Sequence, residues 1–151
     1  HKPLAQHEFV MKEVELLKRR SPFLWVDPQQ TQTTLLASGM NGWSGIFFHQ
    51  QQWHALGALH KQNAHLLAIG EKNVCFSAAS DFMNKIETES TSHKSKNWLS
   101  LAPSANQRGY LPAPYRYDST INRYQASVLL TLHFNHANIL KALQKENRHA
   151  H

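Results

Sequence analysis

The sequence predicts an α/β fold: a single domain with a central, mainly parallel sheet flanked by helices. Between Phe23 and Gly70, short apolar runs alternate with segments of helical apolar spacing, in the order strand, helix, strand, helix, strand. The 151 residues, 41% of them hydrophobic, suffice for one core and are too few for two. We therefore expect one domain over residues 1–151, and leave open whether its polar end, residues 144–151, is a disordered tail.

The first two elements are read from apolar spacing and chain breakers. We expect a helix over residues 4–20, because Val10, Val14 and Leu17 form one apolar stripe and a proline follows. The apolar run Phe23–Val26 is bounded by prolines on both sides and is typical of a buried strand.

The next segments predict alternating helices and strands. Residues 31–38 are expected to form a short helix that ends at Gly39, although Asn41-Gly42 leaves a hairpin turn as the alternative. A strand at 46–48, a helix over 51–62 and a strand at 66–69 follow.

Further along, the patterns are weaker. We expect a helix near Phe82 that Ser80-Asp81 caps. The remaining elements are a strand at 98–101, a loop rich in Pro, Gly and Tyr over 103–124, a strand at 126–134 and a helix at 137–145.

The charge balance indicates an acidic partner. The chain has a net charge of +6 and an isoelectric point near 9.6, which favours nucleic acid or an acidic protein surface. Its longest apolar runs fall far short of the roughly 20 residues of a membrane span, so we expect no membrane partner. The single cysteine, Cys75, has apolar neighbours and is expected to be a buried thiol, in keeping with a cytoplasmic protein.

Catalytic signatures are missing from the sequence. It contains no G-x-x-x-x-G-K-[ST] loop to hold nucleotide phosphates and no G-x-S-x-G nucleophile turn. The eleven histidines lack the spacing of a metal site; His54 and His60, for example, point in different directions on a helix. We expect a non-enzymatic protein with no catalytic residues, metal or cofactor. An enzyme whose phosphate loop precedes this sequence is the remaining alternative.

One segment carries a positive indication of function. Over residues 108–124 arginines alternate with tyrosines, a combination that binds single-stranded nucleic acid through stacking and phosphate neutralisation. The alternative is that the tyrosines simply close the edge of the core. The candidate nucleic-acid-binding residues are Arg108, Tyr110, Tyr115, Arg116, Tyr117, Arg123 and Tyr124.

The stretch from Val10 to Gly70 resembles the part of RecA-like domains that follows the phosphate loop, and within them SulA-type cell-division inhibitors. The words that carry the resemblance are "LWVDPQQ" and "ASG". It implies a RecA-like core without the phosphate loop, in a bacterial cytoplasmic protein of the SOS response that blocks polymerisation of FtsZ. The implied contact residues are Arg19, Arg20, Trp25, Val26, Leu35, Met40 and Trp43.

Two functions are therefore expected from different classes. The first is a SulA-like inhibitor that covers an acidic surface of FtsZ, with homodimerisation left open. The second is a basic accessory protein that binds nucleic acid through residues 108–124.

Overall fold

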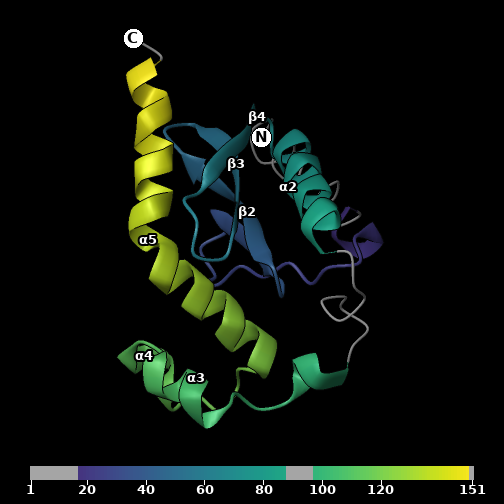
Figure 1. Cartoon of the computed structure of the whole chain (residues 1–151), viewed down its shortest axis with the longest axis vertical. Coiled ribbons are helices and arrows are strands. Elements are labelled where there is room, and N and C mark those ends of the chain that lie inside the picture. Colours follow the sequence, from purple (N-terminus) through teal and green to yellow (C-terminus); the bar gives the residue numbers. More distant parts are fainter. Residues whose placement is uncertain (1–16, 88–96, 150–151) are drawn as a thin grey trace, which may run out of the picture.

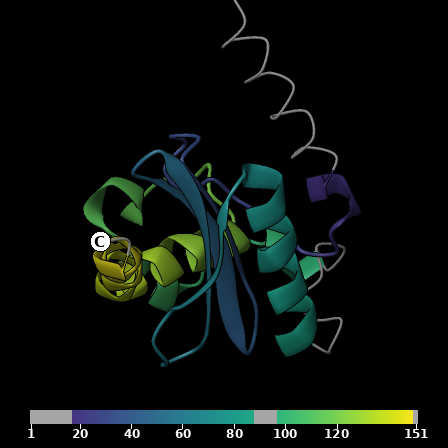
Figure 2. The ribbon, with the colours of Figure 1, turned by 90° about the horizontal axis from the view of Figure 1, so that it is seen from above.

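The computed structural model describes residues 17–87 and 97–149. A four-stranded antiparallel sheet is covered by one helix on each face, so three layers result (Figures 1 and 2). The strands are β1 (Thr34–Ser38), β2 (Gly42–His49), β3 (Gln52–Leu59) and β4 (His65–Gly70). The helices are α2 (Lys72–Ile86), the 3-10 helix η2 (Asn97–Ser100), α3 (Ala105–Tyr110), α4 (Ala113–Arg116) and α5 (Arg123–His149).

Consecutive hairpins build the sheet in the order β1-β2-β3-β4. The tightest turn joins β2 to β3, where His49 pairs with Gln52 and only Gln50 and Gln51 lie between. Both turn residues have positive φ angles, 49° and 69°, as a turn matched to the twist of two antiparallel strands requires. An isolated bridge from Val26 to β1 is the only strand-like pairing of the 23–26 segment within the described chain.

The sheet buries both faces, because α2 and α5 pack on opposite sides of it (Figure 2). On one side Ile46 and Ala55 meet Phe76 and Met83 of α2. On the other side α5 packs against residues of the strands through Tyr124, Val128, Ile139 and Leu143. None of the described helices is long and apolar enough to span a membrane.

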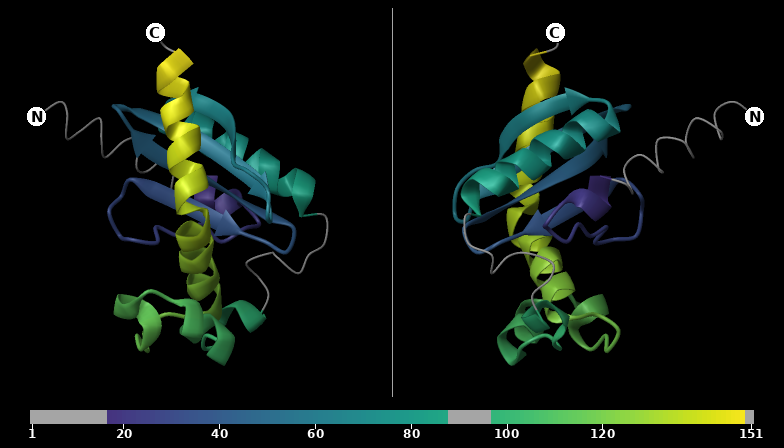
Figure 3. Two further views of the ribbon diagram at one scale, coloured as in Figure 1. Left: turned by 60° about the vertical axis from the view of Figure 1, so that its left-hand side comes forward. Right: turned by 90° about the vertical axis from the view of Figure 1, so that its right-hand side faces the viewer.

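Helix α5 extends beyond the sheet, and its first turns pack against α3 and α4 (Figure 3). Asn122 caps the start of α5: its side chain accepts from the Gln125 amide, and the Gln125 side chain accepts from the Asn122 amide, both at 2.8 Å. Ser104 and Gln107 form the same reciprocal cap on α3. These caps define the residues at which both helices begin. They explain why α3 is helical although it has no long apolar run.

The predicted fold class is wrong: all strand pairs are antiparallel, and the sheet is not a RecA-like core. The predicted helix at 51–62 is strand β3, whose residues 54–58 are all buried. A strand with a helix on each face shows no alternation of polar and apolar residues, so the spacing of Trp53, Leu56 and Leu59 matched a helix by coincidence.

The other element corrections have similar causes. The predicted helix at 31–38 is mostly strand β1. Gly39 does not end a helix: it lies in the β1–β2 turn, where a Cβ atom would overlap the Glu87 carboxylate. The predicted strand at 126–134 belongs to α5, where apolar residues face the sheet on one side and α3 and α4 on another, so the run lacks a single apolar helical stripe.

Four further expectations can be placed. Strand 66–69 agrees with β4, and the helix near Phe82 exists, although it begins at Lys72 rather than at Ser80. The predicted strand at 98–101 is largely the 3-10 helix η2. Of the helix expected over 4–20, only residues 17–20 are described, and they are helical; the rest lies outside the described residues.

Candidate nucleic-acid interface

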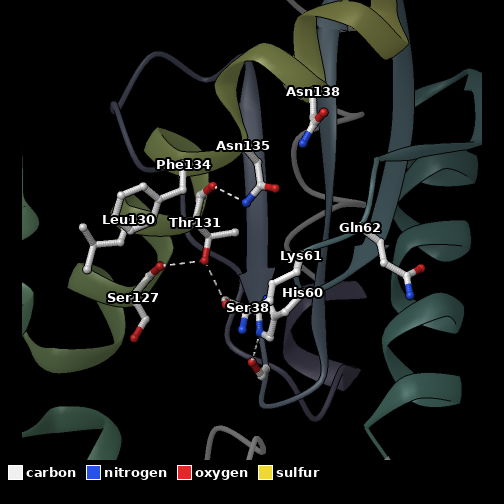
Figure 4. Close-up of a pocket in the computed structure, with 11 residues that line it drawn as sticks. Ser38, His60, Lys61, Gln62, Ser127, Leu130, Thr131, Phe134, Asn135 and Asn138 are labelled. Atoms are coloured by element: carbon white, nitrogen blue, oxygen red, sulfur yellow. Dashed lines mark hydrogen bonds between the residues drawn. The ribbon is translucent and has the colours of Figure 1, made fainter.

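A groove of about 500 Å³ lies between α5 and the turns at one end of the sheet (Figure 4). One wall is the face of α5, and the other consists of the end of β1 and the β3–β4 turn. This volume falls in the range of small-ligand pockets, about 300–1,000 Å³. The lining residues are Ser38, Gly39, His60, Lys61, Gln62, Ser127, Leu130, Thr131, Phe134, Asn135 and Asn138.

Hydrogen bonds fix the floor of the groove. The hydroxyls of Ser38 and Thr131 lie 3.0 Å apart, and Thr131 donates to the Ser127 carbonyl at 2.8 Å. One turn further along α5, the Asn135 amide nitrogen donates to the Thr131 carbonyl at 2.8 Å. In Figure 4 the Ser38–Thr131 bond joins β1 to α5, and the other two bonds connect successive turns within α5. The Ser38–Thr131 bond therefore ties the α5 wall to the sheet.

The opposite wall is a turn that carries a cation. The His60 Nε2 atom lies 2.8 Å from the Gly39 carbonyl, and since a carbonyl only accepts, Nε2 bears the hydrogen. This bond ties the β3–β4 turn to the β1–β2 turn. Next in the chain, Lys61 is exposed, with a φ of 69°. Within the part of the chain that the structure describes, its ammonium group pairs with no carboxylate.

Two exposed aromatic rings stand beside the groove. Phe134 lines it from α5 and is 61% exposed, and Tyr110, at the end of α3, is 65% exposed. Their ring centroids lie 5.9 Å apart at an interplanar angle of 71°. We call these two residues the aromatic pair. His133 also contacts Phe134, with 5.4 Å between the ring centroids and an interplanar angle of 55°. Such uncovered rings can stack with flat ligands.

The arginines predicted to bind nucleic acid mainly hold the 102–118 segment together. Arg108 donates to the carbonyls of Arg116 and Asp118 at 2.9 and 3.2 Å. Arg116 donates to the Leu111 carbonyl at 3.3 Å, and Arg123 to the Ala102 carbonyl at 3.2 Å. Because carbonyls carry no net charge, these arginines still contribute positive potential while they brace the loop.

The predicted tyrosines are distributed over three environments. Tyr110 belongs to the aromatic pair, and Tyr117 is 85% exposed. Tyr115 is half-buried beside Leu129 in a smaller pocket next to α5. Tyr124 is buried: its hydroxyl accepts from the Ser38 amide at 3.0 Å, and burial raises the pKa of its phenol well above the usual value. Tyr110 therefore lies beside the groove as an exposed ring, whereas Tyr124 meets a groove residue, Ser38, only through its buried hydroxyl.

The residues implied by the SulA resemblance do not form one surface. Trp25, Leu35 and Trp43 are core residues and are not available to a partner. Met40 is exposed in the β1–β2 turn, Val26 is half-buried, and Arg19 and Arg20 are exposed at the end of the first helix.

Sequence reasoning missed most of the groove residues. Lys61 looked like the end of a helix, and Phe134 like the end of a strand. The sequence did offer one signal, the reciprocal caps at Ser104 and Asn122, because such caps predict that α3 and α5 are helices. Phe134 is then expected within a helix and not at the end of a strand.

Other chemistry is sparse in the described residues. No group of three or more His, Cys, Asp or Glu side chains within 17–87 and 97–149 has the geometry to hold a metal ion. The expectation for Cys75 is confirmed: the residue is buried, and burial raises the pKa of its thiol.

Together these features describe a small three-layer α/β domain with a polar groove beside an exposed aromatic pair. Residues 7–151 match the family model described as the C-terminal domain of the mitochondrial helicase Irc3, and the chain belongs to this family. Neither the curated proteins nor the solved structures include a significant match. The resemblance to SulA-type inhibitors is therefore wrong, as are FtsZ as the partner, a role in the SOS response and a bacterial cytoplasmic location.

Proposed function

We propose that this chain is a nucleic-acid-binding domain of a mitochondrial helicase, and that it binds the substrate without a catalytic reaction of its own. The family supports this, because a helicase acts on nucleic acid. The observation that carries the proposal is the groove with the aromatic pair beside it: Lys61 and Phe134 line the groove, and Tyr110 contacts Phe134. Phosphate neutralisation and base stacking need these two kinds of group side by side.

Charge supports the same assignment. The chain carries a net charge of +6, and a nucleic acid that binds it releases counterions from its phosphates. The arginines that brace residues 102–118 lie close to the aromatic pair in sequence and structure, which adds positive potential on that side. The absence of a phosphate loop from the sequence agrees with a role in binding rather than in nucleotide hydrolysis.

The test is the salt dependence of oligonucleotide binding, followed by fluorescence anisotropy. We expect Lys61→Ala to weaken binding and to lower the slope of log K against log salt by about 1, because one phosphate contact is lost. Lys85→Ala is the matched control, since Lys85 is an exposed lysine on α2, across the sheet from the groove. Equal effects of the two substitutions, or an unchanged slope for Lys61→Ala, would contradict the proposed site.

A further inference from the structure

The side chains in and beside the groove also indicate which form of nucleic acid binds there. Resting on the proposed function, we infer that it binds unpaired nucleotides, with a base stacked on the aromatic pair and its edge facing the amide side chains of the groove. The inference concerns the state of the bases, whereas the proposed function concerns only the binding of nucleic acid.

The first argument is the exposure of the rings. Phe134 and Tyr110 are 61% and 65% exposed, although Phe134 also contacts His133. The two rings of the aromatic pair meet edge to face, so this contact covers only one face of one ring. A base inside a duplex has a neighbouring base on each side and offers no free face to such a ring. An unpaired base can leave its neighbours and stack, which contributes about 1–3 kcal/mol per base in proteins that bind single strands.

The second argument is the chemistry of the groove walls. Gln62 and Asn138 line it from opposite sides, and among the described residues neither side-chain amide makes a hydrogen bond (Figure 4). Asn135 uses its amide nitrogen on the Thr131 carbonyl, which leaves its side-chain oxygen as an acceptor. Carboxamides offer a donor and an acceptor together and therefore pair well with the edges of bases.

The third argument is position. Lys61 stands on the turn across from Phe134, so a nucleotide stacked on the ring can direct its phosphate to that ammonium group. Lys141 is exposed two helical turns beyond Phe134 and lies on the same face of α5, where it extends the positive charge along the helix. A stacking surface followed by cations suits a flexible single strand laid along α5.

The experiment compares a single-stranded oligonucleotide of roughly 12 nucleotides with a duplex of the same length, using the whole chain. We expect Phe134→Ala and Tyr110→Ala each to weaken single-strand binding by about 5- to 100-fold, while the affinity for the duplex changes less than about 2-fold. Phe134→Tyr keeps the ring and should keep the affinity. Tyr117→Ala is the control, because Tyr117 is exposed but neither lines the groove nor belongs to the aromatic pair.

The outcomes separate the two proposals. If duplex binds as well as single strand, and the ring substitutions weaken both equally or neither, the inference is wrong, while a lysine-dependent salt slope still supports the proposed function. If no nucleic acid binds, both are wrong. If Tyr117→Ala weakens single-strand binding as much as Phe134→Ala does, stacking occurs elsewhere and the inference also fails. Circular dichroism confirms that each variant remains folded.

Discussion

The buried hydroxyl of Tyr124 is the most specific polar link between α5 and the sheet at the base of the groove. It accepts a hydrogen bond from the Ser38 amide at 3.0 Å, and Tyr124 is only 2% exposed. Tyr124→Phe removes the acceptor but keeps the ring. We expect the free energy of unfolding to fall by about 1–3 kcal/mol, because the amide is left buried without a partner.

Urea denaturation followed by circular dichroism gives this free energy if the transition is two-state. In a domain of this size each kcal/mol also lowers Tm by roughly 2–4 °C. Tyr117→Phe serves as the control, since that hydroxyl is on an exposed side chain and should change stability by less than about 0.5 kcal/mol. A loss in Tyr124→Phe no larger than in the control would refute the role of the hydroxyl.

The same substitution tests the direction of the pKa shift. The folded-state pKa of Tyr124 is raised above the value of 10.0 taken for the unfolded chain, so the unfolded state loses its proton first as pH rises. The contribution of the neutral phenol to the free energy of unfolding is fully present below pH 10 and declines above it. The difference in the free energy of unfolding between wild type and Tyr124→Phe should therefore shrink at alkaline pH. A difference that grows there would contradict a raised pKa of Tyr124.

Three further predictions concern the sheet and the Cys75 thiol of α2. Gln51→Gly should stabilise the protein by about 0.5–1 kcal/mol in urea denaturation, because relief of left-handed strain exceeds the added backbone entropy of the unfolded state; a destabilised variant would contradict this. Gly42→Ala should destabilise by more than about 2 kcal/mol, since its Cβ atom would overlap the Ala58 carbonyl oxygen, and an unchanged Tm would disprove that close approach. Cys75 should resist iodoacetamide in the native state and react in urea, because burial raises the pKa of its thiol; rapid native alkylation at neutral pH would argue against this burial.

The sequence predicts isolated features of this fold better than its architecture. Strand β4 and the burial of Cys75 follow from local apolar patterns. Strand β3 does not, because helices cover both faces of the sheet and the strand loses its alternation. The turn before it escapes notice as well, since Gln50 and Gln51 adopt positive φ angles without glycine or asparagine.

The candidate site was even less accessible to sequence reasoning. An alternating Arg and Tyr pattern drew attention to residues 108–124, yet Arg108 and Arg116 are bonded to backbone carbonyls and Tyr124 is in the core. The groove unites the β3–β4 turn with the middle of α5, which are far apart in the chain. Only the packing of α5 across the sheet brings Lys61 and Phe134 to the same groove.

The most direct test of a nucleic-acid site in this groove is to map amide chemical shifts of the whole chain by NMR during titration with a single-stranded oligonucleotide. The groove model predicts that the largest changes occur at residues from both walls, Gly39, Lys61 and Gln62 on one side and Phe134, Asn135 and Asn138 on the other. Amides of α2, on the opposite face of the sheet, should barely move. Changes concentrated on α2, or no changes at saturating oligonucleotide, would contradict it.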